Sequence, residues 1–244
     1  MKKNHLILLA ILSVISLSAF AFINIKSTSD TQSNIDFFYG VDSRYATTLT
    51  KDKVINARWF DELFPERATK GIETWHSTEV VVLEGENKIK SKGIGNRFSP
   101  DQFELLQSID YSTNFYITEN CEKRRDPLTL EKDSIVYWMT IIPENEARYK
   151  DGHNALIDYL KKNSQDDISI VKQGSIQPGR IDFLISTEGK IENISLDSST
   201  GYPTIDDAMI NLINKIPGQW IPASNSNGEA VPQKLVFFFG NMGC

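Results

Sequence analysis

Near the end of this 244-residue chain, five apolar residues follow one another without interruption, from Leu235 to Phe239. A run of this length predicts a strand that is buried on both faces of its sheet. Such a strand restricts the fold, because both faces then have to be covered. Helices of the same domain can cover one face, which leaves the first domain, a partner or a second copy for the other. The alternative is that the phenylalanines simply form the core of one domain.

Signals for helices and strands alternate over the hundred residues that precede this run. Asp151 can cap a helix, and residues 181–185 alternate apolar and polar side chains as a half-buried strand does. Residues 191–196 form the return strand, where a change of phase predicts a β-bulge. Thr204 then begins a second helix. The order α, β, β, α, β predicts an α+β fold for residues 146–244.

The preceding region, residues 36–143, predicts a smaller strand-rich domain of unknown role with one clear helix. Ser99, Pro100 and Gln102 carry the start signal of that helix, which is a capping serine, a proline in the first turn and a glutamine at the third position. A weaker pattern predicts another helix over residues 52–63. The expected strands cover residues 78–83, 88–92, 113–119 and 134–142, with a charged loop containing Lys123, Arg124 and Arg125 between the last two.

The first residues carry an export signal. Lys2 and Lys3 precede an apolar run over residues 6–23, and a polar tether over residues 24–35 follows it. Residues 1–23 are therefore either a signal peptide, with small residues for cleavage at Ala19 and Ala21, or a membrane anchor about 27 Å long. Both alternatives place the remaining chain outside the cytoplasm.

Charge and composition argue against several classes of function. A formal net charge of −6 argues against a nucleic-acid-binding surface, which needs clustered lysine and arginine. The sequence has no zinc, nucleotide or hydrolase motif, and neither His76 nor His153 has a second ligand one helical turn away. Cys121 and Cys244 can pair or remain free. We therefore expect no cofactor, no metal site and no enzymatic activity.

Several segments of the C-terminal region resemble the TonB C-terminal domain family, in the form common in Bacteroidetes-type proteins. They are Asp151-Gly152-His153-Asn154-Ala155-Leu156, Gly179-Arg180-Ile181-Asp182-Phe183, Gly189-Lys190-Ile191-Glu192-Asn193-Ile194 and Trp220-Ile221-Pro222-Ala223. The match covers residues 146–244, and the order and spacing of the segments are more specific than any one of them. Residues 78–142 are also similar to the β-rich periplasmic domains of GldM-type gliding-motility proteins.

The resemblance implies a periplasmic domain of two helices and a three-stranded antiparallel sheet. In that family the last strand binds a peptide from an outer-membrane receptor at the sheet edge and transmits energy for transport. The residues that match this recruiting strand are Lys234, Leu235, Val236, Phe237, Phe238 and Phe239. An exposed edge offers unpaired backbone groups to an extended peptide, so strand addition is physically sound there. The expected partner is thus an envelope protein such as a receptor, and a second copy in a homodimer is the alternative.

Three features depart from the family pattern. The tether of about ten residues reaches at most ~35 Å, whereas the family's transducers have a long proline-rich spacer. His5 precedes the apolar run instead of lying within it, so coupling to an ExbB and ExbD motor is not supported. Gln177-Pro178 stands where a Tyr-Pro pair is usual. The alternative function is therefore a structural or sensory envelope protein that uses the domain for packing, without energy coupling.

Overall fold

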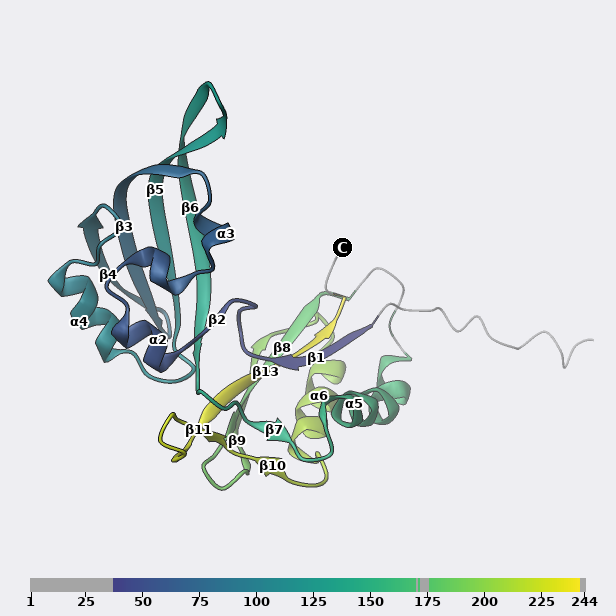
Figure 1. Ribbon diagram of the computed structural model, residues 1–244. Coiled ribbons are helices and arrows are strands. Elements are labelled where there is room, and N and C mark those ends of the chain that lie inside the picture. Colours follow the sequence, from purple (N-terminus) through teal and green to yellow (C-terminus); the bar gives the residue numbers. More distant parts are fainter. Residues whose placement is uncertain (1–36, 170, 172–175, 242–244) are drawn as a thin grey trace, which may run out of the picture. The chain divides into compact units, whose positions relative to one another are not determined.

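The computed structural model describes residues 37–169, 171 and 176–241 (Figure 1). The expected export segment, the tether and Cys244 lie outside the described residues. Within the described part, strands account for 46% of the residues and form four sheets. None of the helices described is long and apolar enough to cross a membrane.

One sheet has five strands in the order β2-β6-β5-β3-β4. Its strands are β2 (Thr48–Thr50), β3 (Ile72–Glu84), β4 (Asn87–Ile94), β5 (Asn114–Asp126) and β6 (Thr129–Ile142). The short helices of this region are α2 (Lys51–Asn56), η1 (Phe60–Leu63), α3 (Glu66–Thr69) and α4 (Pro100–Ser108). Val54 of α2, Phe60 of η1 and Leu106 of α4 form one apolar core with Phe115 of β5 and Met139 of β6. The helices therefore cover one face of this sheet.

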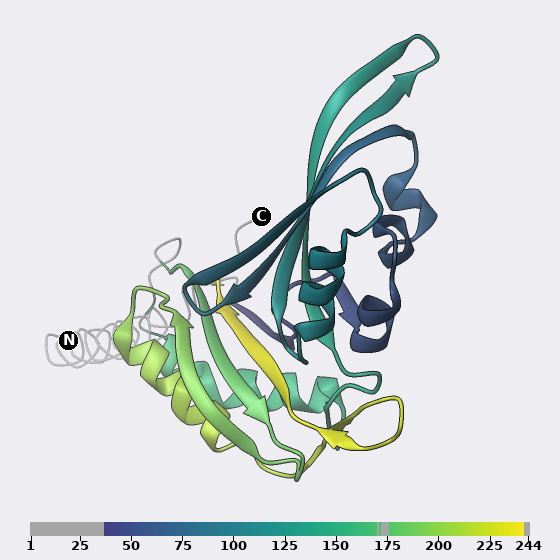
Figure 2. The ribbon, with the colours of Figure 1, turned by 90° about the vertical axis from the view of Figure 1, so that its left-hand side faces the viewer.

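The second large sheet has four strands in the order β1-β13-β8-β9. Its strands are β1 (Phe38–Asp42), β8 (Pro178–Ile185), β9 (Ile191–Ser198) and β13 (Gln233–Gly240). Helices α5 (His153–Ile168) and α6 (Pro203–Asn214) lie side by side on one face of it (Figures 1 and 2). Two small sheets pair β7 (Arg148–Tyr149) with β10 (Trp220–Ile221), and β11 (Ala223–Ser224) with β12 (Ala230–Val231).

The fold class expected from the sequence is wrong. The described chain is mostly β rather than α+β, and two helices with a three-stranded sheet do not account for it. The C-terminal sheet gains a fourth strand because Phe38 to Asp42 pair antiparallel with β13. These five residues are too short a run, with glycine at their centre, to give a clear strand pattern on their own.

Three local expectations are also corrected. Asp151 does not cap α5, because the residue at the N-cap is Gly152, with a φ of 92° that favours glycine. The expected helix over residues 52–63 divides into α2 and η1. The basic residues 123–125 belong to β5 instead of a loop. The β5–β6 hairpin extends beyond the core, and an ion pair between Arg125 and Glu131, at 2.7 Å, joins its two arms.

Other local expectations are confirmed. The Ser99 side chain accepts a hydrogen bond from the backbone of Gln102, and the Gln102 side chain accepts one from the backbone of Ser99 at 2.9 Å, which is the capping box. The change of phase in the return strand is a β-bulge, because the register between β8 and β9 shifts between the Asp182 and Leu184 pairs. Such signals are local, so the sequence alone is sufficient for them.

Replacing Gln102 by alanine is expected to lower the free energy of unfolding by about 2–3 kcal/mol. Gln102 is fully buried, and its amide also donates to the carbonyls of Thr78 at 2.8 Å and Ser91 at 3.3 Å. Three backbone groups would therefore lose their partner. Ser99→Ala, which removes one cap bond, is the matched control and should cost about 1 kcal/mol. Urea unfolding measures both, and equal losses would contradict this role of Gln102.

Candidate functional site

The six residues expected to bind a partner, Lys234 to Phe239, all lie in β13, but that strand is not at an edge of its sheet. It pairs with β8 on one side and with β1 on the other, from Asp42 opposite Val236 to Phe38 opposite Gly240. The backbone of residues 236–240 is therefore paired on both sides. Lys234 and Leu235 lie beyond the end of β1, and the backbone N–H of Lys234 donates to the Ser112 hydroxyl at 2.8 Å.

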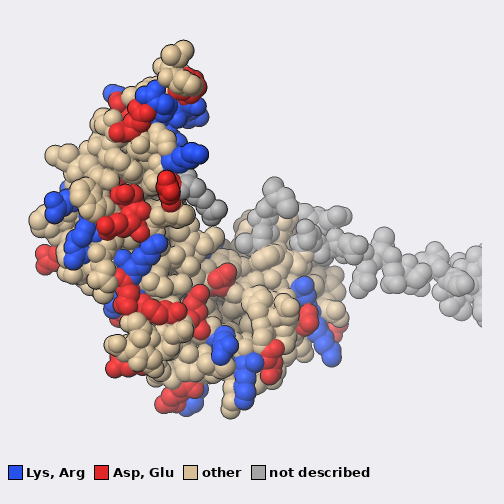
Figure 3. Space-filling model, in the orientation of Figure 1, with Lys and Arg blue, Asp and Glu red and all other residues tan. Residues whose placement is uncertain are grey.

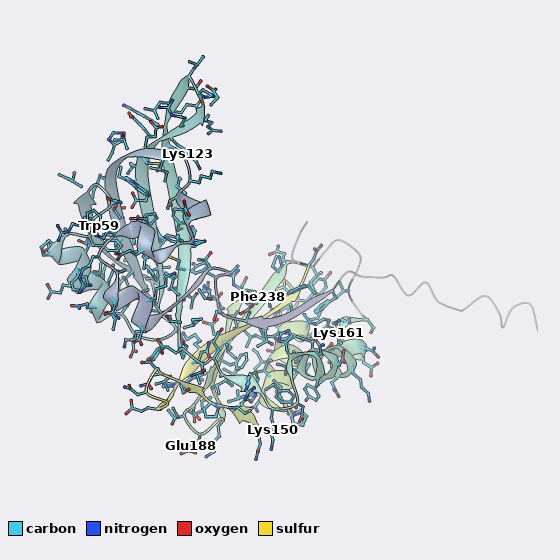
Figure 4. All side chains as sticks on the ribbon, in the orientation of Figure 1. Trp59, Lys123, Lys150, Lys161, Glu188 and Phe238 are labelled. Carbon is cyan, nitrogen blue, oxygen red and sulfur yellow. The ribbon has the colours of Figure 1, made fainter. Side chains whose placement is uncertain are left out.

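Both faces of β13 are largely covered, as its apolar run predicts. Phe237 and Phe239 are fully buried among α5, α6 and the sheet, and their rings stack with centroids 5.0 Å apart. Val236 points to the opposite face and is 1% exposed. Phe238 shares that face and is half-buried (labelled in Figure 4). Phe237 and Phe239 are therefore core residues, whereas Phe238 is not.

Strand β1 is held against β13 by two side chains that point toward the helices. Tyr39 and Val41 are 9% and 7% exposed. The Tyr39 hydroxyl lies 2.5 Å from the hydroxyl of Ser164 on α5, and since Ser164 already donates to the Leu160 carbonyl, Tyr39 is the donor. Burial raises the pKa of Tyr39 above its ordinary value. The strand thus has two inward anchors, spaced two residues apart.

An ion pair fixes the chain where it leaves β1. Arg44 lies 3.0 Å from the carboxylate of Asp197 on β9 and 3.8 Å from that of Asp182 on β8. Burial raises the pKa of Asp182, while burial of Asp197 is outweighed by Arg180 and Arg44, which hold the pKa of Asp197 below its ordinary value. These groups are partly exposed, so the pairs add modestly to the hold on β1.

A hollow of about 570 Å³ opens where β1 ends and α5 begins. We call it the α5 hollow. Among the residues that line it are Asp42, Arg148, Lys150, His153, Trp220 and Leu235. Trp220 is 7% exposed, and its indole Nε1 has no hydrogen-bond partner among the described residues. A buried indole N–H normally finds an acceptor, but this atom is itself covered, so it is not a donor that the hollow presents.

Some charged side chains around the α5 hollow have hydrogen-bond partners, whereas others have none of opposite charge. The Asp42 carboxylate accepts from the backbone of Ser43 at 2.7 Å, and Glu146 accepts from Gln233 at 2.8 Å. In contrast, the structure gives Arg148 and Lys150 no carboxylate partner within the residues it describes, and Lys150 reaches only the amide of Gln219 at 3.5 Å. Lys150 stands beside the start of α5 (Figure 4). The hollow therefore has charged residues of both signs in its lining, Arg148 and Lys150 together with Asp42 and Glu146.

One buried carboxylate lies outside the α5 hollow, on the core face of the five-stranded sheet. Glu119 of β5 is 0% exposed, and neither of its oxygens has a hydrogen-bond partner in the described chain. Burial, assisted by the negative charge of Asp61, raises the pKa of Glu119 to about 8. Perturbed carboxyl groups often mark active sites, but a substrate cannot reach Glu119 without opening the core.

The remaining sequence candidates do not come together in a site. His76 lies 3.4 Å from Glu122 at the surface, whereas His153 belongs to the α5 hollow. Cys121 is buried as a free thiol. No cluster of three metal-ligating side chains occurs among the described residues. On the face seen in Figure 3, acidic and basic side chains are interspersed, without a large region of one sign.

Sequence reasoning missed both β1 and the α5 hollow. The sequence signal available for β1 was the alternation of Tyr39 and Val41 with Gly40 and Asp42. This alternation is regular, but it is too short to identify a strand. Searches for related proteins add no family to this picture, because no family model, no curated protein and no solved structure matches the chain.

Proposed function

We propose that this protein is an exported, periplasmic protein-interaction protein of the cell envelope, and that it binds an extended strand of a partner at β13. One observation carries the proposal. The edge of β13 already accepts a strand from a distant part of the sequence, with five residue pairs and two inward side chains. Backbone pairing combined with alternate buried side chains is the mode of strand-addition recognition. The motifs that resemble TonB C-terminal domains support the same mode, with an outer-membrane receptor as the partner.

In this proposal β1 occupies the position beside β13 that the partner strand would take. A partner strand would form the same backbone hydrogen bonds to β13 that β1 gives up. The free energy of exchanging one strand for the other is therefore small. The segment after β1 is held by one partly exposed ion-pair cluster around Arg44, which is a modest barrier.

A second function is favoured by the same pairing. Because β1 closes the edge of β13, the sheet can also serve as a packing module in a structural or sensory envelope protein, with no strand exchange and no energy coupling. In that case β1 stays in place during every interaction of the protein.

Locking β1 to β13 distinguishes these two functions. Gly40 and Phe238 face each other across the two strands, on the face away from the helices, so Gly40→Cys with Phe238→Cys can form a disulfide. In a Cys244→Ala background, we expect the oxidised variant to retain less than about a tenth of the wild-type capture of an outer-membrane receptor from solubilised outer membranes. Reduction should restore the capture.

The single variant Gly40→Cys, treated in the same way, is the matched control. Equal capture of the receptor by the oxidised and reduced double variants would show that β1 does not leave, and would support the packing module. If neither form captures a receptor, strand addition to a receptor is wrong.

A further inference from the structure

The contacts of β1 indicate what kind of peptide can pair with β13 in its place. β1 runs antiparallel to β13, with Tyr39 opposite Phe239 and Val41 opposite Phe237. The Tyr39 ring lies 6.3 Å from that of Phe237, and its hydroxyl reaches Ser164. An aromatic ring with a hydroxyl therefore fits the first inward position better than an aliphatic side chain, which would leave the Ser164 hydroxyl without this donor.

The position between the two anchors has little influence on binding. Gly40 points to the other face, where a Cβ would meet only the ring of Phe38 at 2.7 Å. Phe38 is 46% exposed and can move aside. The edge is thus selective at alternate positions, as expected for a peptide that adds to a sheet.

The α5 hollow lies at the end of β1, and Val41 and Asp42 are among the residues that line it. Its charges are mixed, because Glu146 lines it as well as Arg148 and Lys150. The side chain of Asp42 alternates with that of Val41, so it does not share the inward face of the strand. The hollow therefore sets no requirement at the position after the aliphatic residue.

From these contacts we infer that the strand that replaces β1 beside β13 is an extended peptide with tyrosine and an aliphatic residue two positions apart, both facing the helices. The inference rests on the proposed function, since it specifies the strand that replaces β1. The peptide runs antiparallel to β13, as β1 does. β1 competes with it, so the apparent affinity for the peptide is reduced by the fraction of molecules in which β1 is bound.

Fluorescence anisotropy with labelled peptides and the full-length protein tests this inference. The first peptide has the sequence of residues 36–43. The second peptide has the same composition, but its tyrosine and its valine are each shifted by one position along the sequence. Tyr39→Ala weakens the hold of β1, so we expect this variant to bind the first peptide at least about tenfold more tightly than the wild type does. Val41→Ala is a milder second variant, should Tyr39→Ala fail to fold.

Two further substitutions report on the specific contacts. Phenylalanine in place of the peptide tyrosine should weaken binding about fivefold, but not when the protein carries Ser164→Ala as well.

The outcomes separate the inference from the proposed function. Equal binding of the two peptides of the same composition would overturn the specificity inferred here and leave strand addition intact. If neither peptide binds a folded Tyr39→Ala or Val41→Ala variant, β13 does not accept a free strand, and the proposed function fails with the inference.

Discussion

The free energy of unfolding is expected to fall by about 4 kcal/mol as the pH rises from about 4.5 to about 8, because of the single carboxyl group of Glu119. The group is buried without a partner in the described structure, so the folded protein holds its proton more tightly than the unfolded chain does. The stability is fully present below pH 4.5, the ordinary pKa of the group, and is lost as the pH rises through the folded-state value near 8. Urea unfolding across this pH range measures the effect.

Glu119→Gln is the control for this pH dependence. The amide has a similar shape but stays neutral at every pH, so the variant should unfold with a flatter pH profile and exceed the wild type in stability near pH 8. Other carboxylates, such as Asp197, have a lowered pKa and lose stability as the pH falls, but they contribute equally to both proteins. Parallel profiles for the wild type and the variant would show that folding does not raise the pKa of Glu119.

Phe237→Ala is expected to cost about 3–5 kcal/mol in the free energy of unfolding. The side chain is fully buried between the sheet and the helices, and it contacts the rings of both Phe239 and Tyr39. Its loss leaves a cavity that also weakens the hold on β1. Thermal or urea unfolding of the full chain measures the change.

The neighbouring substitution Phe238→Ala provides a matched control, since it removes the same side chain from the opposite, half-exposed face. We expect a loss of about 1 kcal/mol. A loss as large as that of Phe237→Ala would mean that the outer face of β13 is packed as tightly as the core.

The sequence contains local information that the structure confirms. The capping box at Ser99, the strand around Ile181 and the second C-terminal helix depend on residues close in the chain, and each was predictable. The strand expected from Thr78 is present, but β3 begins earlier, at Ile72. The start of that helix shows the limit. Asp206 is buried within α6, and its carboxylate accepts from the Thr200 backbone N–H at 3.0 Å and from the hydroxyls of Ser199 and Thr200. No simple capping pattern predicts that arrangement.

The candidate site could be predicted only in part. The apolar residues Leu235 to Phe239 identified the strand, but they could not show which segment lies beside it. That neighbour is set by non-local pairing, which short-range patterns do not contain. The α5 hollow combines Asp42 with residues more than a hundred positions later, such as Lys150 and Trp220, so its donors are dispersed in the sequence. The fold class was wrong partly because this fourth strand of the C-terminal sheet was missed.

The pairing of Tyr39 with Phe239 joins positions 200 residues apart, and this separation governs the order in which the protein can fold. The five-stranded sheet is built mostly from neighbouring hairpins, β3 with β4 and β5 with β6, which close quickly. The four-stranded sheet instead is complete only when β1 pairs with β13, the last strand in the sequence. Contacts of such high sequence separation form slowly. On a chain that emerges with its N-terminus first, β1 is made long before β13. It therefore remains an unpaired, apolar segment that is prone to association with other chains until synthesis is nearly complete.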